Sequence, residues 1–256
     1  MTKAWLVVMV VMVSASTPAQ SVPTAKPAEV KAAEAMPTVD QVLEKYVQAL
    51  GGRSALQKVS SRTSKGTFEI PTYGSHASEE IYEKAPNKSV SITNDPNYGV
   101  VRLGFNGSVG WQEDPDNGLR EFSGAQLATL KRNSDFYRDL NLKQLYVTMT
   151  LKSREKVGNH EAYVVEATPA DGSPEQMYFD KDNGLLILVK TTRDGQQGRV
   201  QVETSYEDYR EVDGIKLPFT IHQSRPGFSF IIRLSEVQHN VPIDDAKFEK
   251  PAPEQH

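Results

Sequence analysis

The five histidines are the first residues to consider for chemistry, because imidazole both binds metals and transfers protons. No two of them have the HxH or HxxxH spacing of metal ligands. They are His76, His160, His222, His239 and His256. His222 shares the parity of Thr220 on the polar side of an expected strand, and we interpret it as a solvated strand residue. The histidine pattern therefore predicts no metal site.

Adjacent carboxylates are the next candidates, because acid–base catalysis needs two such groups to converge on one substrate. Glu79 and Glu80 lie in an expected strand, where neighbouring residues point to opposite faces. Asp244 and Asp245 fit a cap of the closing turn instead. Four further charged residues in the middle of the chain are interpreted as a solvated charge ladder: Arg132, Asp135, Arg138 and Asp139.

Known catalytic motifs are also missing from the sequence. It contains no GxSxG, Walker A or GxGxxG pattern, and it has no cysteine. The missing cysteines exclude disulfides, thiolate zinc sites and thiol nucleophiles. The net charge of -4 disfavours nucleic acid as a partner, since nucleic acid attracts clustered Lys and Arg. We therefore expect a protein that is not an enzyme and that uses no cofactor.

Alternating apolar and polar residues over 198–240 predict three consecutive antiparallel strands. Asp213-Gly214 and Pro226-Gly227 mark the turns, and Asp-Gly is a strong hairpin signal. Side chains alternate across a strand, so one face is wet and the other must be covered. The apolar parity comprises Val200, Val202, Thr204, Tyr206, Ile215, Leu217, Phe219, Ile221, Phe228, Phe230, Ile232 and Leu234.

The remaining chain predicts more strands and two helical covers. Strands separated by turns over 60–113 and 147–191 are typical of an antiparallel meander. The segment 114–146 breaks this pattern and predicts a helical insertion with starts at Ser123 and Ser134. A capping box of Thr38 and Gln41 begins an amphipathic helix that ends at 51–52. The predicted fold is mainly β (α+β), a single antiparallel sheet of roughly ten or eleven strands.

The N-terminus predicts export. Lys3 precedes an apolar run over 4–13, which is shorter than the roughly 20 residues that span a bilayer. Thr17 and Ala19 then provide small residues at the spacing of a cleavage site. We expect a signal peptide at 1–19, a disordered Ala/Pro-rich linker at 20–37, one domain at 38–250 and a disordered tail at 251–256. The mature protein should be periplasmic or extracellular, with no membrane span and no lipid-bearing cysteine.

The aromatic residues raise the question of a ligand. Tyr206, Phe219, Phe228 and Phe230 share the inner face of the terminal strands, and we place Phe68 and Trp111 near them. Such stripes usually form core. A sheet of this size nevertheless presents more apolar surface than one helix and a short insertion can cover. The surplus predicts a cavity.

Architecture and three phrases resemble the LolA/LolB/LppX-like superfamily of exported lipid and lipoprotein carriers. The phrases are TVDQVLEKYVQALGG at 38–52, EDYREVDGIKLPF at 207–219 and NVPIDDAKFEKP at 240–251. The resemblance implies a curved open half-barrel, whose concave face is covered by helices and binds acyl chains. It also implies an envelope location and a protein partner for delivery.

Two functions remain open at this point. The first is a non-catalytic carrier for a lipid or a lipoprotein acyl chain. Its expected ligand-binding residues on the first helix are Leu43, Tyr46, Val47 and Leu50, and those on the concave wall are Val202, Tyr206, Phe219, Ile221, Phe228, Phe230 and Ile232. The alternative is an envelope sensor or protein-interaction module that has the same fold with a filled core.

Overall fold

The computed structural model describes residues 35–170, 172–195 and 198–252, and its helices and strands belong to one compact unit that begins at Pro37. The predicted signal peptide, most of the linker and the end of the tail lie outside the described residues. The helical elements are α1 (Val39–Ala49), α2 (Arg53–Gln57), η1 (Pro71–Tyr73), α3 (Gly124–Asn133), α4 (Arg138–Leu145) and η2 (Asp245–Phe248).

The strands of the described chain form one open antiparallel sheet, which confirms the predicted mainly β half-barrel. They are β1 (Ser61–Ile70), β2 (Ser75–Lys84), β3 (Lys88–Asp95), β4 (Gly99–Phe105), β5 (Gly110–Asp114), β6 (Gly118–Glu121), β7 (Thr148–Val157), β8 (His160–Thr168), β9 (Glu175–Asp180), β10 (Leu186–Gly195), β11 (Gly198–Val212), β12 (Ile215–Arg225) and β13 (Phe228–His239).

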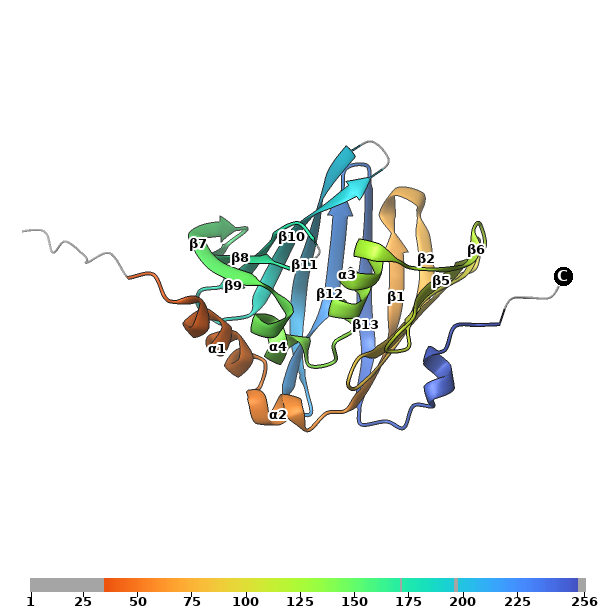
Figure 1. The fold of residues 1–256 in the computed structure, drawn as a ribbon, viewed down its shortest axis with the longest axis horizontal. Coiled ribbons are helices and arrows are strands. Elements are labelled where there is room, and N and C mark those ends of the chain that lie inside the picture. Colours follow the sequence, from red (N-terminus) through yellow and green to blue (C-terminus); the bar gives the residue numbers. More distant parts are fainter. Residues whose placement is uncertain (1–34, 171, 196–197, 253–256) are drawn as a thin grey trace, which may run out of the picture. The chain divides into compact units, whose positions relative to one another are not determined.

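The strand order explains why the helical insertion lies over the sheet. The order is β6-β5-β4-β3-β2-β1-β13-β12-β11-β10-β9-β8-β7, so β6 and β7 form the two opposite edges. The segment 122–147 that joins these edges must therefore cross a face of the sheet, and it does so with α3 and α4 (Figure 1). Pairing of β1 with β13 joins the first meander to the second.

Helix α1 begins and ends as its sequence predicts. The Gln41 amide donates to the Thr38 hydroxyl at 3.2 Å, and the Thr38 amide donates to the Gln41 side chain at 2.8 Å. The helix ends before Gly51, which has φ +120 and whose added Cβ would lie 2.1 Å from the Gly214 carbonyl oxygen. Only glycine allows this close approach, which ties the end of α1 to the β11–β12 turn.

The core lies on both faces of the sheet. On the concave face, α1 and α4 pack on the apolar side chains of β7–β10, including Val165, Met177 and Phe179. On the convex face, Phe248 of η2 packs with Val90 and Trp111, and it is fully buried. Trp111 is opposite Gly104, which is opposite Val90, so these three positions share the convex face. The prediction that Trp111 lies near Phe68 was therefore wrong, because the register places them on opposite faces.

The number of strands and the start of one helix also differ from prediction. The described sheet has 13 strands, not ten or eleven. Strand β6, which the sequence pattern places in the insertion, is short, has Leu119 as its one apolar side chain and follows a turn capped by the Asp114 carboxylate, so no alternating pattern marks it. Helix α4 begins at Arg138 rather than near Ser134, because Asp135 accepts the Tyr137 amide in a separate turn.

Candidate functional site

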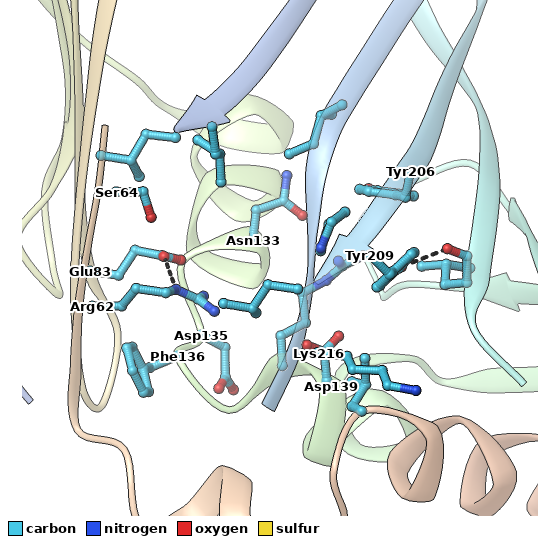
Figure 2. A pocket seen from close by; sticks show the side chains of 18 of the residues that line it. Arg62, Ser64, Glu83, Asn133, Asp135, Phe136, Asp139, Tyr206, Tyr209 and Lys216 are labelled. Carbon is cyan, nitrogen blue, oxygen red and sulfur yellow. Dashed lines mark hydrogen bonds and ion pairs between the residues drawn. The ribbon is translucent and has the colours of Figure 1, made fainter. Parts of the chain in front are cut away.

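A cavity of about 260 Å³ lies between the helices and the concave face of the sheet (Figure 2). Residues of α1, of the segment 133–139 and of strands β1, β2 and β10–β13 line it. They are Tyr46, Leu50, Arg62, Ser64, Ile81, Glu83, Asn133, Asp135, Phe136, Arg138, Asp139, Leu186, Tyr206, Tyr209, Lys216, Leu217, Pro218, Ile221 and Leu234.

One wall of the cavity is apolar and continues beyond it. Ile221 is opposite Tyr206 on β11 and opposite Ile232 on β13, and Ile232 is opposite Phe68 on β1. Directly opposed residues share a face, so these side chains form a row across four strands. Along β13 the same parity runs outward from Leu234 to a half-buried apolar strip, which we call the β13 strip: Ile232, Phe230 and Phe228.

Aromatic contacts order this strip. The rings of Phe68 and Phe230 stack with centroids 4.9 Å apart and an interplanar angle of 23°. Phe228 meets Phe230 at 6.3 Å in a T-shaped arrangement. Because these rings remain half-buried, they leave apolar surface on the concave face open to a ligand.

The other wall is polar and carries charge. Arg62 on β1 pairs with Glu83 on β2 at 2.7 Å, and its guanidinium lies 5.8 Å from the centroid of the Phe136 ring. Burial alone would lower the pKa of Arg62, but the adjacent Glu83 carboxylate raises it overall. The Arg62 guanidinium thus remains charged inside the cavity.

Arg138, the first residue of α4, differs from Arg62 in its surroundings. Its Nε is buried and has no hydrogen-bond partner. Burial opposes its charge, but the Tyr146 and Tyr206 hydroxyls and the Asp139 carboxylate raise its pKa overall. The guanidinium is therefore a half-buried cation among tyrosines, with its Nε out of solvent.

Hydrogen bonds fix the insertion over the cavity. The Tyr46 hydroxyl donates to the Asp139 carboxylate at 2.8 Å, and burial followed by this carboxylate raises the Tyr46 pKa well above its ordinary value. The Tyr137 hydroxyl donates to the Val59 carbonyl at 3.1 Å. The Phe136 amide donates to the Pro86 carbonyl at 2.9 Å. The segment 133–139 is thus held to α1 through Asp139 and to the chain on either side of β1 and β2 through Tyr137 and Phe136.

A second buried ion pair supports the same segment from α3. Arg132 pairs with Glu175 at 2.8 Å, and the Tyr146 hydroxyl donates to the other Glu175 oxygen at 2.8 Å. The interpretation of the insertion's charges as a solvated ladder was therefore wrong. Arg132 is buried in an ion pair, and Asp135, Arg138 and Asp139 line the cavity. The crossover from β6 to β7 turns them inward, and their spacing alone could not indicate this.

The residues predicted to bind a ligand fall into three groups. Tyr46, Leu50, Tyr206 and Ile221 line the cavity. Phe228, Phe230 and Ile232 form the β13 strip. The other four are buried but do not line the cavity: Leu43, Val47, Val202 and Phe219. Among these four, Leu43 belongs to the core beneath α1.

Sequence reasoning missed the charged half of the lining. Arg62, Glu83 and Arg138 line the cavity, and none was named as a site residue. A usable signal did exist for Arg62 and Glu83. Arg62 has the same parity as Ser64 and Phe68 on β1, and Glu83 is directly opposite Arg62 on β2, so strand alternation places both on the concave face.

Within the described residues, no group of three or more His, Asp or Glu could hold a metal ion, and no helix is long and apolar enough to cross a membrane.

Comparison with solved structures identifies the fold of this chain. No family model matches the sequence, and no curated protein matches it. A DUF1329 family protein from Desulfovibrio piger is 18% identical with a TM-score of 0.57, covering 84% of this chain and 98% of its own. The LolA superfamily protein NE2245 from Nitrosomonas europaea is 16% identical with a TM-score of 0.56, and the match covers 84% of this chain and 99% of that protein.

A third structure agrees with these two. A domain described as an outer membrane lipoprotein-sorting protein from Vibrio parahaemolyticus is 12% identical with a TM-score of 0.55, covering 81% of this chain and 97% of its own. At such identities the likeness concerns the fold alone. The chain has a LolA/LolB/LppX-like fold, as the sequence resemblance indicated.

Proposed function

We propose that this chain, whose fold is that of the LolA superfamily structures, is an exported, non-catalytic carrier of a hydrophobic ligand in the cell envelope. The observation that supports it most directly is the continuity of apolar surface from the cavity wall onto the β13 strip. Leu234 lines the cavity, and Ile232, Phe230 and Phe228 follow on the same face of the same strand.

The dimensions favour a single acyl chain over a bulky ligand. The cavity of about 260 Å³ is smaller than the roughly 300–1,000 Å³ of pockets that enclose drug-sized molecules. Leu234 to Phe228 spans six residues, or roughly 20 Å at about 3.4 Å per residue. A chain could therefore begin in the cavity and continue along the strip, gaining about 0.8 kcal/mol per buried methylene before ordering costs.

Ligand extraction tests the proposal. The exported protein is purified from the envelope without detergent, extracted with solvent and analysed by mass spectrometry. We expect co-purifying lipid and displaceable binding of a fluorescent fatty-acid probe. A protein that contains no lipid and binds no probe would instead favour the filled-core interaction module.

A pair of variants on one strand separates binding from folding. Phe230→Asp places a charge on the concave β13 strip, whereas Ile231→Asp places the same charge one residue away on the opposite face. We expect Phe230→Asp to weaken probe binding at least tenfold while the fold persists, and Ile231→Asp to leave probe binding within about twofold. Equal effects of the two variants on binding would count against the strip as the binding surface.

A further inference from the structure

The Arg138 guanidinium is a feature that a purely hydrocarbon ligand would not need. It lines the cavity, and its Nε is buried without a hydrogen-bond partner. Burying a charged group away from water is costly unless another group pairs with it. A cation in this position therefore has capacity for a further partner of opposite charge.

Comparison with its neighbours shows that Arg138 is unusual. Arg62 pairs with Glu83 and Arg132 pairs with Glu175. Among the described residues, no carboxylate forms an ion pair with Arg138 within 4.0 Å. Asp139 contributes negative charge nearby, but its carboxylate already accepts the Tyr46 hydroxyl at 2.8 Å.

The position of Arg138 relative to the apolar wall suggests how a ligand would lie. Its partner Tyr206 is opposite Ile221, and Ile221 is opposite Ile232 at the start of the β13 strip. Tyr206 and Ile221 thus connect the cation to the strip across neighbouring strands. An extended molecule with an anionic head and an apolar tail would match both features.

We infer that Arg138 binds the anionic headgroup, a carboxylate or a phosphate, of a single-chain amphiphile whose tail lies on the β13 strip. This inference rests on the proposed carrier function and adds the class of its ligand. A guanidinium presents parallel N–H donors that match both groups in bidentate geometry. Hydrogen bonds to charged groups are stronger than neutral ones, so the headgroup should change affinity measurably.

Competition with a displaceable fluorescent fatty-acid probe tests the inference. Palmitate, hexadecanol and inorganic phosphate are compared as competitors. Wild type should bind palmitate about tenfold more tightly than hexadecanol, and millimolar inorganic phosphate should not displace the probe. Displacement by phosphate alone would identify a free-anion site and overturn the amphiphile assignment.

Variants at Arg138 assign the preference to this side chain. Arg138→Met should abolish the preference for palmitate while hexadecanol binding stays within about twofold, and Arg138→Lys should retain part of it. Arg53→Met removes the same charge from an exposed position on α2 and serves as the matched control. A preference that persists in Arg138→Met, or is lost equally in Arg53→Met, would overturn the inference.

The outcomes also separate this inference from the proposed function. If neither palmitate nor hexadecanol binds to wild type, the carrier proposal itself fails. If both bind wild type equally, only the headgroup assignment fails. Should Arg138→Met not fold, the wild-type ratio and the Arg138→Lys variant decide the question.

Discussion

The Tyr46 hydroxyl donates a hydrogen bond of 2.8 Å to the Asp139 carboxylate, and this bond joins α1 to α4. Tyr46 is almost fully buried, and its ring meets Phe179 at 5.2 Å in a T-shaped contact. One residue of α1 therefore contacts the sheet through its ring and the covering insertion through its hydroxyl. The two covers of the concave face are coupled at this point.

Removing that hydroxyl should loosen the coupling without opening the core. Tyr46→Phe retains the ring contact but leaves the partly buried carboxylate without this donor, so we expect a loss of roughly 2 kcal/mol in the free energy of unfolding. Urea denaturation measures this loss in the free energy of unfolding, and the m value should stay unchanged. Tyr98→Phe, which removes a hydrogen bond to Asp116 at an exposed position, should leave the free energy of unfolding close to that of wild type.

Glu79 should make stability depend on pH. This carboxyl lies on the concave face, is 3% exposed and accepts the Thr93 hydroxyl, and burial raises its pKa to about 7 from 4.5. The folded state therefore holds a proton that the unfolded state releases between about pH 4.5 and pH 7. The contribution of Glu79 to the free energy of unfolding is fully present at the lower pH. It falls by about 3 kcal/mol as pH rises through that window.

Glu79→Gln isolates this contribution. The variant should show a flatter stability profile between pH 4.5 and pH 7 in urea titrations and should exceed wild type above pH 7. Glu80→Gln changes the neighbouring residue, which points to the other face of β2, and should keep the wild-type slope. An unchanged slope in Glu79→Gln would show that another group causes the pH dependence.

Gly51 and Gly214 meet at the end of α1 and form a matched pair for substitution. Gly51→Ala would place its Cβ 2.1 Å from the Gly214 carbonyl oxygen at φ +120, so we expect a loss of at least about 2 kcal/mol. Gly214→Ala meets no atom within 4 Å and bears only the cost of φ +78, about 1 kcal/mol. Similar losses in thermal unfolding would show that backbone strain, not the close contact, dominates at Gly51.

Phe248 should anchor the C-terminal segment to the convex face. It is fully buried against Val90 and Trp111, and the Trp111 indole donates to its carbonyl at 3.1 Å. We expect Phe248→Ala to cost about 3–5 kcal/mol, the range for deleting a buried phenyl ring. Lys247→Ala, which removes only a cation–π contact with Tyr82, should cost about 0.5–1 kcal/mol in the same urea titration.

Local patterns predicted the elements well because their causes are local. The capping box at Thr38 and Gln41, the apolar face of α1 and the alternation along β11–β13 all follow from neighbouring residues. Strand β6 escaped prediction for the same reason, since its four residues at a sheet edge include one apolar side chain, Leu119, and so show no alternation. The turn at Asp114 was its only local mark.

The sequence by itself determined a single antiparallel sheet with one apolar face, a capped helix at its start and an insertion in the middle. Only the tertiary structure decided that the insertion crosses from edge strand β6 to edge strand β7. That crossing turns Arg138 and Asp139 toward the cavity, where sequence spacing had indicated a solvated face. Which side of a short helix is buried depends on what it lies against, and that contact involves strands far away in the chain.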